Sequence, residues 1–246
     1  MRNNVLAKLT LFAVTIAASV SVAFADDAEQ SPLSVNLDAS IYSDYMFRGL
    51  KLYDGLSFQP SLQPTYSLGE YGNVSALLFM HISADGGPPD KRFFEMDEAI
   101  TYDYTFAPFT FSVGNYWYTY PNSNDDIPMT AEIYSAVSID TVLTPTISYY
   151  HDYKVYDSDY FELGLSHTFE YSGEGAYNFT PFVNFGFVAN GEKYYASNGL
   201  VQSTFGVSTD LPLGIFTLRP LLAYTAKADD NTVNNFWAGT SLSYAF

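Results

Sequence analysis

The stretch that decides the fold is residues 93–106, which read Phe-Phe-Glu-Met-Asp-Glu-Ala-Ile-Thr-Tyr-Asp-Tyr-Thr-Phe. Large apolar residues recur at nearly every second position, and acidic residues or threonines fill most of the positions between them. Successive side chains of a β-strand point to opposite faces, so this pattern predicts a strand with one apolar and one acidic face. Glu95, Asp97 and Asp103 fall on the acidic face, whereas Glu98 falls on the apolar one.

The same alternation continues along most of the chain. Each alternating stretch is long enough for the ~9–11 residues that a tilted strand needs to cross a bilayer, and none has sustained helical periodicity. The sequence therefore predicts an all-β protein, a transmembrane antiparallel up-and-down β-barrel of about twelve strands, with residues 26–246 as one domain. The predicted strands are 34–48, 56–68, 73–83, 93–106, 109–120, 129–140, 143–153, 159–171, 177–189, 199–210, 215–227 and 234–246.

The connections between these strands alternate in length and charge. Those after even-numbered strands are short, such as 69–72 and 107–108, whereas most of the others are longer and charged, such as 84–92 and 121–128. Outer-membrane barrels have short periplasmic turns and longer external loops, so this parity favours such a barrel over a soluble β-sandwich. An even number of strands places both chain ends in the periplasm.

Both ends of the chain carry features of an exported barrel. A basic start and the apolar run 9–24 lead to the small-x-small site 23–25, so residues 1–25 are predicted to be a cleaved signal peptide. A retained membrane anchor is the weaker alternative, because the run is short for a ~20-residue span. The final strand ends in Phe246, and a terminal aromatic resembles the signal that the barrel-assembly machinery of Gram-negative bacteria reads. We therefore expect the protein in the bacterial outer membrane, with outer-membrane lipids and that machinery as partners.

Composition excludes several classes of protein. The chain has 27 Asp+Glu against 10 Lys+Arg, a net charge of -17, whereas binding to nucleic acid needs clustered basic residues. Without cysteine it has no disulfide, no thiol nucleophile and no thiolate metal site. The 22 Tyr and 20 Phe are an excess that is typical of the aromatic girdles of a membrane barrel.

The inward phase of the strands is strongly acidic. Eleven carboxylates and three cations fall on it, and such an excess in a narrow tube concentrates cations and repels anions. We therefore predict a porin-like channel for passive diffusion of small ions and small polar solutes, with a preference for cations. The alternative is that the carboxylates pair with the few cations and with tyrosine hydroxyls and plug the lumen. The predicted pore-lining residues are Asp38, Asp44, Arg48, Glu95, Asp97, Asp103, Glu132, Asp140, Glu162, Arg219 and Lys227, and Asp152, Glu170 and Asp210 complete the acidic set.

Several residues call for separate expectations. Tyr45 and Phe47 fall on the lipid phase of the first predicted strand. His151 and His167 also fall on lipid phases, and we expect them at the level of the headgroups. Arg48 is either part of a constriction or a salt bridge that braces the barrel wall, and the sequence leaves both open. Five prolines remove ladder donors and are expected only near strand ends or bulges, namely Pro60, Pro64, Pro145, Pro181 and Pro220.

Four stretches together resemble a known family. They are Ser-Asp-Tyr-Met-Phe-Arg-Gly at 43–49, Tyr-Trp-Tyr-Thr-Tyr-Pro at 116–121, Glu-Ile-Tyr at 132–134 and Tyr-Phe-Glu-Leu-Gly at 160–164. The sequence looks like a member of the TorF-type porin family (also called the Gcw_chp family) of small outer-membrane proteins of Gram-negative bacteria. The similarity spans most of the mature chain, and 43–49 is its most specific motif. The resemblance implies a barrel and a porin role, without a particular substrate.

A different class of function enters with His81-Ile82-Ser83. The two-residue spacing puts His81 and Ser83 on one face of a strand, as the base and nucleophile of an outer-membrane lipase or deacylase would be. This lipid-processing barrel is the alternative to the channel, and a non-conducting structural or adhesive barrel is a third hypothesis. We favour the channel, and expect no catalytic residue, no metal and no cofactor. The acidic loop pairs at 125–126, 157–159 and 229–230 lack EF-hand spacing, and we expect them to be solvated.

Overall fold

The structure, a computed structural model, describes residues 31–84, 93–121, 127–171, 177–191 and 193–246. The predicted signal peptide and the acidic pair at 125–126 lie outside these residues. The described part of the chain consists mainly of β-strands, with a short 3-10 helix, η1, at Gly69–Tyr71. The strands are β1 (Leu33–Phe47), β2 (Leu50–Ser67), β3 (Asn73–Ser83), β4 (Phe93–Phe106), β5 (Phe109–Thr119), β6 (Thr130–Ile139), β7 (Thr146–Asp152), β8 (Ser158–Ser166), β9 (Phe169–Tyr171), β10 (Tyr177–Ala189), β11 (Gly199–Ser208), β12 (Leu211–Leu213), β13 (Phe216–Lys227) and β14 (Asn235–Ala245).

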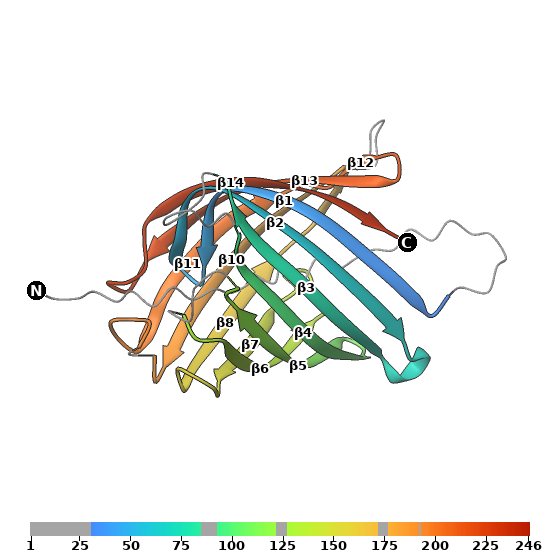
Figure 1. Cartoon of the computed structure of the whole chain (residues 1–246). Helices are drawn as coiled ribbons and strands as arrows, with labels where there is room; N and C mark the ends of the chain where they lie inside the picture. The colour runs from blue at the N-terminus through green and yellow to red at the C-terminus, as the bar shows by residue number, and fades with distance from the viewer. Residues whose placement is uncertain (1–30, 85–92, 122–126, 172–176, 192) are drawn as a thin grey trace, which may run out of the picture.

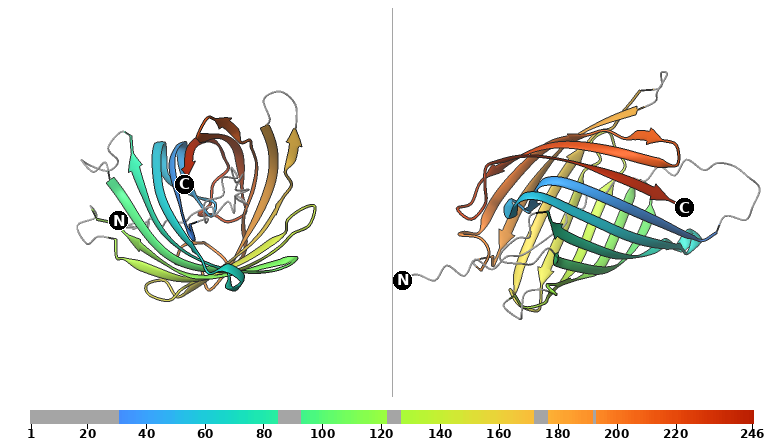
Figure 2. Two further views of the ribbon diagram at one scale, coloured as in Figure 1. Left: turned by 90° about the vertical axis from the view of Figure 1, so that its right-hand side faces the viewer. Right: turned by 45° about the horizontal axis from the view of Figure 1, so that its top comes forward.

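The strands form one closed antiparallel ring (Figure 1, Figure 2). Neighbours in sequence pair with each other, and β1 pairs with β14 to close the ring, with Asn36 opposite Ala245 and Tyr42 opposite Gly239. β8 and β9 are two pieces of one barrel strand, because both pair with β10, and β11 and β12 are two pieces that both pair with β13. The fourteen segments therefore make a barrel of twelve strands, which confirms the predicted fold.

Prolines lie where the ladder is interrupted. Pro181 lies opposite the break between β8 and β9, and Pro220 opposite the break between β11 and β12. At each break one N–H still reaches across, from His167 to the carbonyl of Pro181 and from Thr209 to that of Pro220, both at 3.2 Å. A proline has no N–H to give to the ladder, so the neighbouring strand pairs around it. The pairing of β2 with β3 likewise leaves out Pro60 and Pro64, which lie inside β2.

The outward face of the barrel is apolar. Its exposed side chains include Ile100 and Ile133 along the wall, with Phe106, Phe216 and Phe246 at strand ends. A ring that satisfies its own backbone hydrogen bonds and presents an apolar exterior is suited to lipid surroundings. No helix in the described part of the chain is long and apolar enough to cross a membrane.

The first hairpin departs from the barrel wall. Both described chain ends lie at one end of the barrel, the terminus end, where the N–H of Val35 bonds to the carbonyl of Phe246 at 2.7 Å. At the opposite end, the loop end, β1 pairs with β14 only as far as Tyr42, and β2 pairs with β3 only from Ser57. Residues 43–56 between these points, which we call the inner hairpin, turn into the barrel (Figure 1). Register shifts along β1 bend the strand there, as bulges do.

The inner hairpin corrects two expectations. Tyr45 and Phe47, which the alternation assigns to lipid, are 2% and 4% exposed and lie inside the barrel. The alternation itself persists, but the strand that carries it has left the wall, so neither of its faces meets lipid. Residues 50–55, expected as a loop, form the start of β2 because they pair with the end of β1.

Candidate functional site

The inner hairpin ends in a two-residue turn formed by Arg48 and Gly49. Its φ angles are +42° at Arg48 and +82° at Gly49, the pair of positive values that a type I′ hairpin turn requires. Glycine adopts this conformation freely, whereas arginine rarely does. A residue in such a strained conformation persists where surrounding contacts hold it. The contacts of Arg48 therefore explain its unusual backbone conformation.

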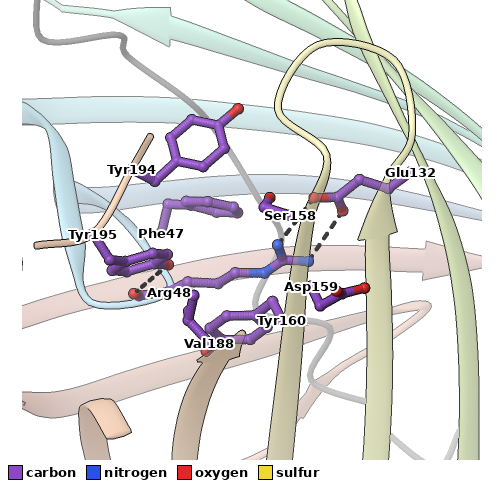
Figure 3. A pocket seen from close by; sticks show the side chains of 9 residues that line it. All are labelled: Phe47, Arg48, Glu132, Ser158, Asp159, Tyr160, Val188, Tyr194 and Tyr195. Carbon is purple, nitrogen blue, oxygen red and sulfur yellow. Dashed lines mark hydrogen bonds and ion pairs between the residues drawn. The ribbon is translucent and has the colours of Figure 1, made fainter. Parts of the chain in front are cut away.

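The Arg48 side chain reaches across the lumen to the opposite wall (Figure 3). Its two terminal nitrogens donate hydrogen bonds of 3.0 Å to the two carboxylate oxygens of Glu132 on β6. The guanidinium also lies 4.2 Å from the ring centroids of Tyr150 on β7 and Tyr160 on β8. The charged side chains of Arg48 and Glu132 are 7% and 6% exposed, so the ion pair is buried. A bidentate carboxylate and facing aromatic rings are the features by which proteins recognise guanidinium groups.

A row of tyrosines supports this ion pair from the barrel wall. Tyr116, Tyr134, Tyr150 and Tyr160 follow one another across β5 to β8, with successive ring centroids 5.7, 5.0 and 6.2 Å apart. Each of the four is 5% exposed or less. The hydroxyl of Tyr118 donates to Glu132 at 2.9 Å and so orients the carboxylate toward the hairpin. Aromatic pairs at these separations attract each other, so the rings of the row support one another beside the arginine.

The loops at the loop end hold the backbone of the turn. The hydroxyl of Tyr195 donates to the carbonyl of Arg48 at 3.2 Å, and the N–H of Val233 donates to that of Gly49 at 3.0 Å. Asp229 ties the two loops together, because its carboxylate accepts hydrogen bonds of 2.9 Å from the N–H groups of both Ala196 and Ser197. The inner hairpin is therefore held at its tip by the wall and by the loops.

The root of the inner hairpin packs against β3 and β4. The ring of Tyr45 stacks on His81 with centroids 4.3 Å apart, and its hydroxyl donates to Glu95 at 3.0 Å. The Nδ1 atom of His81 lies 2.8 Å from the hydroxyl oxygen of Ser57. His81 and Ser83 share the lumen face of β3, as their spacing predicts, and are 1% and 2% exposed. The hairpin therefore packs on His81, and Ser83 beside it is equally buried.

The predicted pore-lining residues divide into a packed and a partly open group. In the packed group, Glu95 and Asp97 are fully buried, and the Arg48–Glu132 pair is nearly so. Asp44 belongs to it as well, because its Oδ1 atom lies 3.1 Å from the Nζ atom of Lys51 within the inner hairpin. The partly open group is half-buried, lies nearer the terminus end and consists of Asp38, Asp103, Glu162, Asp210 and Arg219. Arg219 pairs with Asp210, and the other three carboxylates accept hydrogen bonds from serine or tyrosine hydroxyls. The lumen is thus filled at the loop end and less filled at the terminus end.

The remaining predicted inward residues lie at the margins. Asp140 follows the end of β6 in an exposed turn at the terminus end, and Lys227 pairs with Asp230 at 3.2 Å at the loop end. Glu170 is exposed on β9. Asp152 is fully buried and accepts the N–H groups of residues 154–156, so it shapes the loop after β7. Among the described residues, no group of three or more acidic or histidine side chains is placed to hold a metal ion.

Two features of the outward face match the alternation. Glu98 is exposed on β4, between the outward positions of Met96 and Ile100. His151 lies opposite Asp159, with its Nδ1 atom 3.0 Å from the carboxylate.

The sequence pattern does not single out Tyr150 or Tyr160, because tyrosine is common on both faces of this barrel.

The fold is similar to those of solved outer-membrane proteins. LpxR from Salmonella typhimurium superposes with a TM-score of 0.56 at 10% identity, covering 85% of this chain and 99% of its own. The NanC porin gives 0.52 at 11% identity, with 86% and 98% covered, and an outer-membrane channel from Pseudomonas putida F1 gives 0.52 at 10%, with 89% and 97% covered. At such identities the likeness establishes the fold, a barrel of the outer-membrane type. No curated protein matches the chain.

Residues 26–178 match a sequence family described as bacterial proteins of unknown function, Gcw_chp. The match covers more than half of the chain and includes the motif 43–49, which forms the inward part of β1 and the Arg48–Gly49 turn. It also includes Glu132, Tyr150 and Tyr160, which receive the guanidinium. The protein therefore belongs to the Gcw_chp family.

Proposed function

We propose that the protein is an outer-membrane channel of the porin type, through which small ions and small polar solutes diffuse passively, with a preference for cations. The observation that carries the proposal is the carboxylate excess on the lumen face, from Asp97 beside Glu95 to the half-buried Asp103 and Glu162. At an effective dielectric constant of about 20, a carboxylate attracts a monovalent cation about 5 Å away by about 3 kcal/mol. It repels an anion to the same degree, so the lumen favours cations.

The comparisons support this class of function. The NanC porin and the Pseudomonas putida channel share the barrel over most of both chains. The family match begins at residue 26, directly after the expected signal peptide, which supports export to the outer membrane. The TorF-type porin role that the sequence motifs suggest is part of the same proposal.

The inner hairpin is the constriction in this proposal. Tyr45, Phe47 and Arg48 bring buried side chains into the loop-end half of the lumen. Solutes entering from the terminus end meet the half-buried carboxylates first and the hairpin afterwards. Conduction should therefore rise when the hairpin is shortened.

Single-channel recording of the refolded barrel in a planar bilayer under a salt gradient tests the proposal. We expect a reversal potential of cation-selective sign, and larger steps when residues 45–53 are replaced by Asn-Gly, which makes a tight hairpin turn. We expect two variants to move the reversal potential toward zero. One combines Glu95→Gln with Asp97→Asn, and the other adds Glu132→Gln to these two. Glu98→Gln is the control for position, because it removes one carboxylate from the outward face and should leave the reversal potential unchanged. A folded barrel that is silent with and without the hairpin would exclude a channel and favour a non-conducting structural or adhesive barrel.

The lipid-processing alternative has one contact in its favour. The 2.8 Å between His81 and Ser57 places a serine hydroxyl within hydrogen-bond reach of an imidazole, which nucleophilic catalysis requires. His81, Ser57 and Ser83 are at most 2% exposed, so a lipid would reach them only after the inner hairpin moved. Lipid hydrolysis that is lost in Ser57→Ala or Ser83→Ala would favour this alternative. No hydrolysis by the hairpin-shortened barrel would remove it.

A further inference from the structure

The environment of Arg48 has the composition of a ligand-binding site. A carboxylate, Glu132, receives both terminal nitrogens of the guanidinium at 3.0 Å, and the rings of Tyr150 and Tyr160 lie at 4.2 Å from it. Figure 3 shows the guanidinium directed at Glu132 with the ring of Tyr160 beside it. These are the groups that bind a planar organic cation from solution. Here the chain itself supplies the cation.

The walls of this site belong to the barrel, and its occupant belongs to the inner hairpin. Glu132 lies on β6, Tyr150 on β7 and Tyr160 on β8, three adjacent strands of the ring. Phe47, with its ring 5.0 Å from the guanidinium, is the hairpin's own contribution. The barrel residues are held by the tyrosine row and by Tyr118, independently of the hairpin. These contacts among the site's wall residues come from the barrel and include none from the hairpin.

Only the end of the arginine side chain is recognised. Both terminal nitrogens are hydrogen-bonded, whereas the buried Nε atom has no hydrogen-bond partner among the described residues. The arginine backbone is moreover in a conformation that arginine rarely adopts, with φ at +42°. A free alkylguanidinium could make the same two hydrogen bonds and the same ring contacts without that backbone cost. An alkylammonium lacks the planar fork and matches the carboxylate less well.

We propose that Glu132, Tyr150 and Tyr160 form a binding site for solutes that carry a guanidinium group, and that Arg48 occupies this site as a tethered competitor. Solute and inner hairpin then exclude each other, so binding would release the hairpin. The proposal deepens the proposed function, because it names a solute class for the lumen, but its binding test does not depend on conduction.

Calorimetric titration of the refolded barrel with n-propylguanidinium tests the site. Arg48→Ala vacates it, and we expect this variant to bind the probe at least tenfold more tightly than the wild type does. Adding Glu132→Gln should weaken binding at least tenfold, and n-propylammonium should bind at least fivefold more weakly than n-propylguanidinium. Arg219→Ala is the matched control, since Arg219 is also an ion-paired arginine but is 29% exposed. It should bind no better than the wild type.

A folded Arg48→Ala barrel that binds no more tightly than Arg219→Ala would overturn the proposal. The barrel with residues 45–53 replaced by Asn-Gly provides a second vacated site, and absence of binding there would overturn it equally. Binding by barrels that do not conduct would uphold the site and reject the channel. Cation-selective conduction without binding would reject the site and uphold the channel.

Discussion

The backbone of Gly49 passes so close to Gln202 that a Cβ on Gly49 would lie 2.5 Å from the Cβ of Gln202. The same Cβ would lie 3.0 Å from a methyl carbon of Thr232, and the φ of Gly49 is +82°. Two features therefore require glycine at this position: the positive φ of the turn, and the close packing of the turn against β11 and the loop between β13 and β14. The tip of the inner hairpin is fitted to the barrel and does not rest in it loosely.

Gly49→Ala should undock the inner hairpin. The substitution adds both a left-handed backbone cost and a clash, so we expect a loss of about 2–4 kcal/mol in the free energy of unfolding and larger conductance steps. Urea unfolding from lipid vesicles and single-channel recording measure the two effects. Gly69→Ala is the control, because Gly69 has φ +64° but no atom within 4 Å of its Cβ position. Equal losses in the two variants would show that the contact with Gln202 is unimportant.

Removing one partner of the Arg48–Glu132 pair should cost more than removing both. Glu132→Gln leaves a buried guanidinium without its hydrogen-bonded counter-ion, and breaking a buried pair in this way costs about 3–5 kcal/mol. Combining Arg48→Met with Glu132→Gln removes the stranded charge, so we expect the double variant to be more stable than Glu132→Gln alone. Urea unfolding of the wild type, Arg48→Met alone, Glu132→Gln alone and the double variant gives the coupling free energy. Strictly additive losses would contradict a direct pairing of the two residues.

The barrel itself follows from local patterns in the sequence. The alternation at 93–106 predicts β4 because period two is a property of the strand alone, and the charged or glycine-rich connections mark the strand ends. The fold prediction needs no knowledge of which residues meet across the lumen.

The inner hairpin could not be predicted in this way. Tyr45 and Phe47 alternate as they would in the wall, so the pattern is the same whether the strand stays in the ring or turns inward. The local signal is the Arg48–Gly49 turn, which indicates the position at which the chain reverses. It does not indicate whether the hairpin stays in the barrel wall or turns into the lumen. Glu132, 84 positions from Arg48, meets it only because the curvature and stagger of the closed ring bring the two together. Inward placement of both residues was predictable, and their pairing was not.

Glu98→Leu should stabilise the barrel in lipid. The carboxylate is exposed on the apolar outward face of β4, where an acidic residue within the bilayer costs up to about 2 kcal/mol. We expect the free energy of unfolding to rise by about 1–2 kcal/mol, as measured by urea unfolding from vesicles. Glu70→Leu is the control, because Glu70 lies in the exposed helix η1 at the terminus end, outside the strands. A similar gain from both substitutions would contradict a membrane-specific cost at Glu98.

Acidification should loosen the loops that hold the inner hairpin. Burial alone would raise the pKa of Asp229, but hydrogen bonds from the N–H groups of Ala196 and Asn231 and from Ser197 outweigh it and lower the pKa below its ordinary value of 3.8. A carboxyl with a lowered pKa stabilises the folded loops fully above that ordinary value, and this contribution is lost as the pH falls through the folded-state pKa.

The loops should therefore stay closed down to pH about 4 and loosen below it. The protection of the Ala196 and Ser197 amides against hydrogen exchange, corrected for the intrinsic pH dependence of exchange, measures this directly. Asp229→Asn should reduce the protection at neutral pH and remove its fall below pH about 4, because an amide does not ionise. Asp230→Asn is the matched control, since Asp230 pairs only with the partly exposed Lys227 among the described residues. It should leave both the protection and its pH dependence as in the wild type. A fall below pH about 4 that survives in Asp229→Asn would assign the transition to another carboxyl.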